Sequence, residues 1–226
     1  AGELRRNWLC AGCSSWKLSL DPRGRRARQP RRLVAAPITM PPMGSGYVAF
    51  ADESIIQMPS GRQAYRIGAA LLATTELEAA RDVLRPLLLP GQSKLHWRDE
   101  SPPRRDQISR QVAATGSMLT IVTHWSEVPA KEERSRRKCL ERLYYELASM
   151  DVQDASLECR QQAQDAKDIR HIVALQARNQ AKNLRLSHLR GKDEPLLWIP
   201  DAVLGALNAA QLGEPRFWDQ VRDTVC

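Results

Sequence analysis

The pattern of hydrophobic and polar positions becomes regular from Tyr47 onward and predicts alternating strands and helices. Short apolar or alternating runs predict strands over residues 47–52, 63–74, 117–125, 155–159 and 183–189. Longer amphipathic runs predict helices over 76–89, 104–115, 131–149, 165–181 and 200–212. The resulting order, β-β-α-α-β-α-β-α-β-α, predicts an α/β or α+β fold with a mixed sheet.

Local signals set several of the expected boundaries. The first strand is expected to end at Asp52, and a turn over residues 59–61 joins it to the second strand. Thr75 is the expected N-cap of the helix over 76–89, which Pro90 and Gly91 terminate. The last helix is expected to begin at Pro200, since proline is favoured in the first turn.

Residues 1–46 differ from the rest of the chain and predict a disordered basic leader before a domain over 47–226. The leader is rich in Arg, Pro and Gly, a composition that buries too little apolar surface to offset the entropy of ordering. Three interpretations remain open: an arm that contacts nucleic acid phosphates, a disordered tail, or translation that starts at Met40 or Met43. Cys10 and Cys13 form half of a zinc knuckle, and with no second pair nearby we expect two unrelated thiols.

The net charge of +8 belongs almost entirely to this leader. Residues 1–46 carry nine basic and two acidic side chains, whereas the other 180 residues carry 25 basic and 24 acidic ones, a net charge of +1. The domain itself is therefore not basic, whereas many nucleic-acid-binding proteins have a clear basic surplus. The five scattered cysteines give no disulfide framework, and no apolar run is long enough for a membrane span or a secretory signal. We expect no membrane association and a cytoplasmic location.

Three carboxylates lie where predicted elements begin or end. Asp52 ends the first strand, Glu158 ends a central strand, and Asp201 opens the last helix. In open α/β sheets the carboxyl ends of the strands line the functional crevice, so these side chains can face one another. Two carboxylates about 5 Å apart repel by roughly 3 kcal/mol at an effective dielectric constant near 20. Mg²⁺ or Mn²⁺, which prefer oxygen ligands, would remove that cost and could activate water against a phosphodiester.

Four short segments resemble the domain-of-unknown-function 3800 (DUF3800) family, which is similar to the RNase H-like fold. Its "DES(G)" signature is matched at 50–54, its "ElH" segment at 94–96, its "E-x-R" strand end at 157–160, and its "aDaiaga" helix start at 199–203. The resemblance spans residues 47–221. It implies an RNase H-like mixed sheet flanked by helices, with Asp52, Glu158 and Asp201 as the catalytic acidic metal site.

The chain departs from that family at two positions. Ile55 stands where a glycine usually follows "DES", and Lys94 stands where an acid is common before "lH". The first departure affects a turn, and the second removes an additional carboxylate. The sequence contains no P-loop, GxSxG, HExxH or GxGxxG motif. Their absence disfavours nucleotide kinases, esterases, zincins and Rossmann enzymes.

Other polar residues have both a functional and a structural interpretation. Five are auxiliary candidates for the site: Glu53, His96, Arg160, Asp165 and Asp168. Glu53 is either a ligand or, if the strand continues past it, a surface charge on the opposite face. His96 either orients water or phosphate or makes an ordinary polar contact. Arg160 either binds phosphate or pairs with Glu158.

Two of these auxiliary candidates, Asp165 and Asp168, share a helix face, where one can supply a fourth carboxylate or Asp165 can complement the helix dipole. The run over 131–138 is typical of a solvated helix face, within which Arg136, Arg137 and Lys138 are candidate contacts to a nucleic acid backbone.

Two hypotheses of different class follow. The first is a Mg²⁺- or Mn²⁺-dependent nuclease or phosphodiesterase, a hydrolase that acts on DNA or RNA. The second is a non-catalytic RNase H-like interaction module with a protein partner in a mobile-element or defence system. The near-neutral charge of the domain favours the second, and the ordered carboxylates favour the first. The sequence specifies neither the kind of nucleic acid nor the oligomeric state.

Overall fold

A five-stranded mixed sheet forms the centre of the molecule. A computed structural model describes residues 46–127 and 132–226. The strands are β1 (Tyr47–Gln57), β2 (Gln63–Ala73), β3 (Met118–Ser126), β4 (Asp154–Glu158) and β5 (Arg185–Leu189). Their order in the sheet is β3-β2-β1-β4-β5. The β1–β2 and β2–β3 pairs are antiparallel, whereas β4 is parallel to both β1 and β5.

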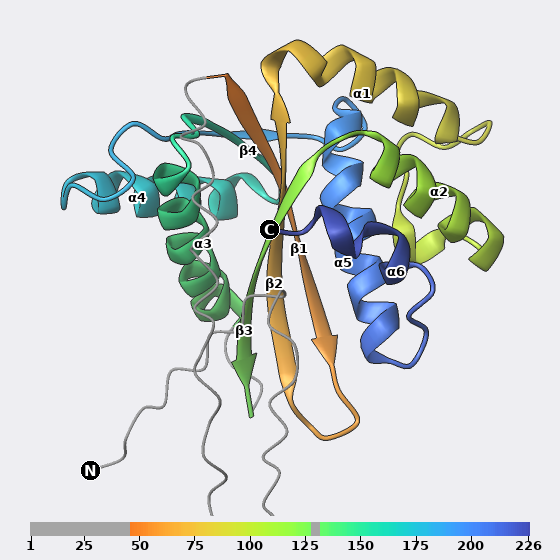
Figure 1. Cartoon of the computed structure of the whole chain (residues 1–226). Helices are drawn as coiled ribbons and strands as arrows, with labels where there is room; N and C mark the ends of the chain where they lie inside the picture. The colour runs from red at the N-terminus through yellow and green to blue at the C-terminus, as the bar shows by residue number, and fades with distance from the viewer. Residues whose placement is uncertain (1–45, 128–131) are drawn as a thin grey trace, which may run out of the picture.

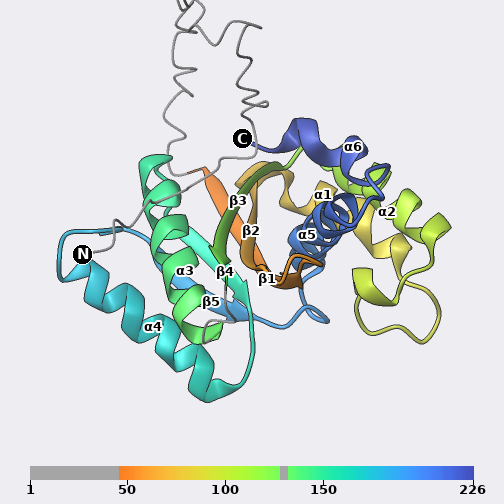
Figure 2. The ribbon, with the colours of Figure 1, turned by 90° about the horizontal axis from the view of Figure 1, so that it is seen from below.

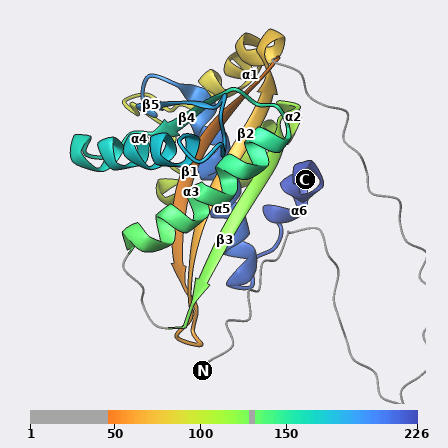
Figure 3. The ribbon, with the colours of Figure 1, turned by 90° about the vertical axis from the view of Figure 1, so that its left-hand side faces the viewer.

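Helices cover both faces of the sheet and make three layers (Figure 1). On one face lie α3 (Glu132–Ser149) and α4 (Gln162–Gln176), which Figure 3 shows in front of the sheet. On the other lie α1 (Leu77–Leu84), α2 (Pro102–Ala114), α5 (Trp198–Gln211) and the short α6 (Trp218–Val221). The view along the sheet in Figure 2 separates the two sets of helices. The predicted α/β class, the mixed sheet with flanking helices, and its RNase H-like arrangement are confirmed.

Each face of the sheet has its own hydrophobic core. Residues of α3 and α4, including Leu143 and Ile172, pack with one face. Residues of α1, α2 and α5, including Leu84, Ile108 and Val203, pack with the other. Strand β2 lies inside the sheet, between β3 and β1, and ten of its eleven residues are buried. Burial on both faces explains why its sequence reads as a nearly continuous apolar run.

The order of the five main strands and helices agrees with the sequence prediction, but several boundaries were wrong. Strand β1 continues past Asp52 to Gln57, because the hairpin ladder with β2 extends until Gln57 pairs with Gln63. The predicted turn follows, with Gly61 at a positive φ of 79°. Asp52 therefore lies inside a strand rather than at its end.

Two helices are shorter than predicted. The first changes after Leu84 into a 3-10 turn that contains Pro86, whose ring is incompatible with a continued α-helix. Its N-cap is Glu76 rather than Thr75, which lies in a preceding 3-10 turn. The other, α4, ends at Gln176, and Asn179 and Ala181 then adopt positive φ angles of 61° and 48°.

Some sequence expectations concern residues that the structure does not describe. Apart from Gly46, the basic leader lies outside the described residues. Cys10 and Cys13 therefore lie outside them too. Lys131, the first residue of the predicted third helix, also lies outside them. None of the helices in the described ranges is both long and apolar enough to cross a membrane.

Candidate functional site

The three carboxylates singled out from the sequence come from three elements. Asp52 lies within β1, Glu158 is the last residue of β4, and Asp201 lies in the first turn of α5. Strands β1 and β4 are parallel, and Ala51 pairs with Leu157 at the end of their shared ladder. The next residue of each strand is a carboxylate, so Asp52 and Glu158 leave that ladder at the same level of the sheet.

Both strand carboxylates point to the face on which α5 packs. Side chains alternate between the two faces of a strand. Ala51 and Leu157, which precede Asp52 and Glu158, belong to the core on the α3 side. Asp52 and Glu158 therefore face the opposite side, where α5 contacts β1 and β2 and contributes Asp201.

A glycine in β2 allows α5 to lie close to this part of the sheet. Gly68 is the cross-strand partner of Asp52. A Cβ atom at Gly68 would lie 3.1 Å from Cγ of Leu204 in α5, tighter than an ordinary van der Waals contact. The absence of a side chain at Gly68 thus allows a short distance between the sheet beside Asp52 and α5, the helix that contains Asp201.

The charges of the neighbouring carboxylates act on Asp52. Burial raises the pKa of Asp52 well above its usual value, and the charges of Asp201 and Glu158 raise it further. The positive charges of Lys94 and His96 act in the opposite direction. One acceptor atom, Asp52 Oδ1, receives a hydrogen bond of 2.7 Å from the backbone N–H of Glu53. The three predicted carboxylates therefore form one electrostatic cluster.

The loop before α2 supplies His96 to this cluster. His96 Nδ1 lies 3.6 Å from Asp201 Oδ2, an ion-pair distance, and it is buried without a hydrogen-bond partner. The contact with Asp201 raises the pKa of His96 above its usual value. The neighbouring backbone N–H of Trp97 donates a hydrogen bond of 2.8 Å to the same Asp201 oxygen. The expectation that His96 lies near the site agrees with this placement.

Lys94 places a positive charge among the carboxylates. Its Nζ donates to Glu158 Oε1 at 2.5 Å. Burial acts to lower the pKa of Lys94, but the hydrogen bond to Glu158 and the charges of Asp52 and Asp201 outweigh it and raise that pKa. From the sequence, Lys94 was interpreted only as a position where the DUF3800 family commonly has an acidic residue. Its ion pair joins residues 64 positions apart, and no local pattern reports such a pair.

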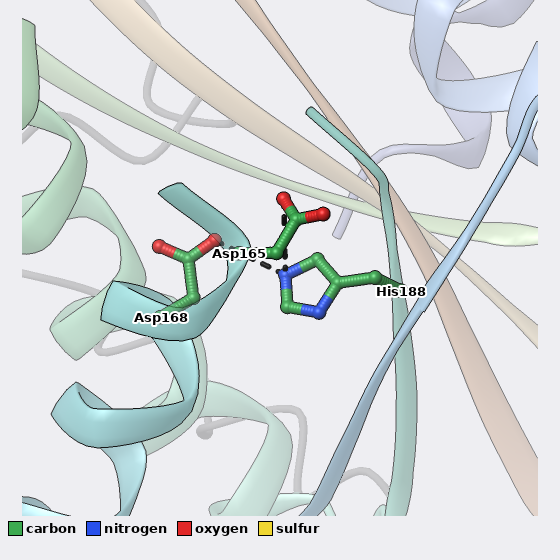
Figure 4. A group of neighbouring side chains, drawn as sticks. All are labelled: Asp165, Asp168 and His188. Carbon is green, nitrogen blue, oxygen red and sulfur yellow. Dashed lines mark hydrogen bonds and ion pairs between the residues drawn. The ribbon is translucent and has the colours of Figure 1, made fainter. Parts of the chain in front are cut away.

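A second polar cluster lies on the other face of the sheet. Ligand atoms of Asp165, Asp168 and His188 all lie within 4.8 Å of one another, the only group of its kind in the described part of the chain (Figure 4). Asp165 and Asp168 come from α4 and His188 from β5. Asp165 and Asp168 were predicted as auxiliary members of the Asp52 site, and that prediction was wrong because α4 packs on the α3 side.

Basic side chains already saturate this second cluster. Arg136, only 3% exposed, contacts both oxygens of Asp168 at 3.1 and 2.8 Å. Arg160 lies 3.4 Å from Asp168 Oδ1, and His188 Nε2 lies 3.2 Å from Oδ2. Burial acts to raise the pKa of Asp168, but the hydrogen bonds from His188 and Arg136 hold that pKa well below its usual range. A metal ion here would have to displace two guanidinium groups.

Glu53 and Arg160 belong to this network rather than to the Asp52 site. Glu53 faces away from Asp52, as alternation predicts, but it is not the solvated surface charge that was expected, since Arg136 and Tyr65 contact its Oε2. Arg160 pairs with Glu53, Glu133 and Asp168. The predicted Arg160–Glu158 pair was wrong: Arg160 lies beyond the last residue of β4 and pairs with the network on the α3 side, whereas Glu158 pairs with Lys94.

The candidate nucleic acid contacts on α3 separate into two kinds. Arg136 is buried against Asp168, so it does not present its charge to a nucleic acid backbone, and that prediction was wrong. Arg137 and Lys138 are exposed, and Lys138 Nζ lies 3.0 Å from His124 Nε2. Both lie on the layer of helices opposite α5 (Figure 2).

Comparisons with known proteins add little beyond the fold. No family model and no curated protein matches the chain. Among solved structures, the chain is similar to a chain of the PCNA:RNase HII complex from Archaeoglobus fulgidus, with 10% identity and a TM-score of 0.48. The alignment covers 77% of this chain and 86% of that chain. The strand order and strand directions described above identify the fold as RNase H-like.

Proposed function

We propose that this chain is a divalent-metal-dependent phosphodiesterase of the nuclease type, with its site at Asp52, Glu158 and Asp201. The observation that supports it is the convergence of three carboxylates from β1, β4 and α5 on one face of the sheet. Such a cluster is costly without a cation: burial raises the pKa of Asp52, and the charges of Asp201 and Glu158 raise it further. The resemblance to the DUF3800 family, which is itself part of the proposal, suggests nucleic acid as the substrate.

The residues present fit Mg²⁺ or Mn²⁺. The donor set consists of carboxylate oxygens, the ligands that these hard cations prefer. A further donor atom, His96 Nδ1, is buried beside Asp201 without a hydrogen bond. Asp52 and Asp201 would hold the cation, and Glu158 adds a third negative charge to the same cluster. When bound, such a cation lowers the pKa of a coordinated water and polarises a phosphodiester oxygen.

The chain's own residues have separate tasks in this proposal. Asp52 is fixed by the β1 ladder and by the hydrogen bond from the Glu53 N–H, so its free oxygen keeps one direction. Asp201 is fixed by the Trp97 N–H. His96 is 44% exposed, and imidazole exchanges protons near neutral pH. His96 is therefore the residue placed to pass a proton between the site and a leaving oxygen.

The test is cleavage of labelled oligonucleotides of single- and double-stranded DNA and RNA, with Mg²⁺, Mn²⁺ or a chelator. We expect cleavage only with metal, and a loss on the order of 100-fold in Asp52→Asn and in Asp201→Asn. Asp223→Asn, at an exposed position, removes the same charge and should cleave like the wild type. Equal rates in Asp52→Asn and the wild type would refute the proposed site.

One observation favours a second candidate, a non-catalytic interaction module. The Lys94–Glu158 ion pair neutralises one carboxylate without any metal, as expected of a site that has lost its chemistry. In that case none of the oligonucleotides is cleaved under any metal condition, and Asp52→Asn has no effect on binding of a protein partner.

A further inference from the structure

The amino group of Lys94 occupies the part of the carboxylate cluster next to Glu158. The Nζ–Oε1 distance is 2.5 Å, and the side chain of Glu158 is only 20% exposed. Among the described residues, Lys94 is the cation that forms an ion pair with Glu158. Within residues 46–127 and 132–226, Glu158 is therefore paired with Lys94 and Asp201 with His96, whereas Asp52 takes part in no ion pair.

The backbone at Gly191 holds this pair in place. A Cβ atom at position 191 would lie 2.7 Å from Glu158 Oε1 and 3.1 Å from Lys94 Cδ. The indole Nε1–H of the buried Trp198 donates a hydrogen bond of 2.6 Å to the Gly191 carbonyl. The loop after β5 thus closes directly over the ammonium and the carboxylate, which limits how far Lys94 can swing away.

Charge balance limits how many cations the cluster can accept. The three carboxylates of Asp52, Glu158 and Asp201 and the ammonium of Lys94 give a formal net charge of −2, with His96 counted as neutral. One divalent cation neutralises that charge, whereas two would leave a net positive charge in a partly buried site. Uncompensated charge in such surroundings is unfavourable.

We propose that the Lys94 ammonium, by pairing with Glu158, limits this site to a single divalent cation held by Asp52 and Asp201. The inference rests on the proposed function, since it requires that the cluster binds metal at all. It specifies a one-metal site in which a fixed ammonium beside Glu158 supplies the second positive charge. Lys94 is a positioning residue for Glu158 and sets the metal stoichiometry.

The experiment is calorimetric titration of Mn²⁺ into the full chain and its variants. The wild type should bind one ion per chain. Lys94→Glu brings the net charge of the cluster to −4, so it should bind two. Lys94→Gln introduces a neutral side chain of similar length, and this variant should bind a second Mn²⁺ ion more weakly. It replaces Lys94→Glu in the experiment if the circular dichroism spectrum of Lys94→Glu differs from that of the wild type. Lys182→Gln, at an exposed position before β5, is the matched control and should still bind one.

The outcomes separate this inference from the function on which it rests. A wild type that binds no Mn²⁺ overturns both. A wild type that binds two ions, or Lys94 variants that fold and still bind only one, overturns the one-metal inference and leaves a metal site in place. One ion in the wild type and two in the Lys94 variants supports it.

Discussion

The backbone N–H of Trp97 donates a hydrogen bond to the carboxylate of Asp201, and the Trp97 indole lies against Gly205, one turn further along α5. The indole also packs edge-on against Phe217, with ring centroids 5.3 Å apart. The loop that contains Lys94 and His96 is thereby attached to the helix that contains Asp201. The loop before α2 and the start of α5, about one hundred residues apart in the sequence, therefore pack together on one side of the site.

Replacement of Gly205 by alanine should disturb this attachment. A Cβ atom at position 205 would overlap the Trp97 ring, and overpacking of this kind costs about 1–3 kcal/mol. We expect a lower free energy of unfolding in guanidinium chloride and weaker Mn²⁺ binding, because the loop must move away from Asp201. A variant as stable as the wild type would show that the indole does not rest on α5.

A double-mutant cycle isolates the contact. Trp97→Ala alone should cost about 3–5 kcal/mol, as for other buried tryptophans. In the Trp97→Ala background, Gly205→Ala should lose its cost and even stabilise α5, since alanine favours helix over glycine by about 1 kcal/mol. Additive effects of the two substitutions would contradict the contact.

Asp52→Asn should stabilise the metal-free protein. At neutral pH the folded state must ionise a carboxyl whose pKa is raised by burial and by the charges of Asp201 and Glu158. An amide of the same shape avoids that cost, so we expect a gain on the order of 1 kcal/mol in the free energy of unfolding. Added Mn²⁺ should raise the melting temperature of the wild type and leave that of the variant unchanged.

The pH dependence of that gain has a definite sign. Because the folded-state pKa of Asp52 lies above its unfolded value, the folded state binds more protons at this carboxyl, and the contribution of Asp52 to stability falls as pH rises above about 4. The fall continues through the folded-state pKa. Asp52→Asn should lack this decline, whereas the exposed control Asp223→Asn should retain it. Parallel stability profiles for Asp52→Asn and the wild type would contradict the raised pKa.

Asp168→Asn should destabilise the fold without affecting metal binding. The substitution leaves the buried Arg136 without its main charge partner, a change that costs about 3–5 kcal/mol. Because the pKa of Asp168 is held below its usual range, the stability it contributes is present above about pH 4 and lost as pH falls further. Chemical unfolding between pH 2 and 7 measures both effects.

The control for this substitution is Asp154→Asn, which removes an exposed carboxylate from Arg185 and should cost less than about 1 kcal/mol. Mn²⁺ binding should be the same in Asp168→Asn and the wild type, because Asp168 lies on the other face of the sheet. Loss of Mn²⁺ binding in Asp168→Asn would move the metal site to the cluster of Asp165, Asp168 and His188.

Hydrophobic periodicity was sufficient to predict the order of the main elements, because the apolar positions of a strand or of one helix face recur within a short stretch of sequence. Boundaries were missed where long-range pairing decides them. The apolar run stops at Asp52, yet β1 continues to Gln57 because β2 supplies a partner for every residue. The cluster of Asp52, Glu158 and Asp201 was predicted from the rule that strand ends meet at one edge. Asp52 is not a strand end, and it lies near Glu158 because the parallel ladder of β1 and β4 ends beside both residues.

The partners of charged side chains could not be predicted from hydrophobic periodicity. Arg136 lies in a run of mixed charges that is typical of a solvated helix face, and only the packing of α3 beside α4 buries it against Asp168. Lys94 and Glu158 are likewise joined by the tertiary fold alone. An ion pair between distant segments has no periodicity, so the sequence predicts the charge but not its partner.

The most direct test of the central claim is the position of Mn²⁺ in an anomalous difference map from crystals of the full chain grown with the metal. We expect a peak between the carboxylates of Asp52 and Asp201, with the Lys94 ammonium still on Glu158. A peak at Asp165, Asp168 and His188, or none near Asp52 at saturating Mn²⁺, would contradict the account.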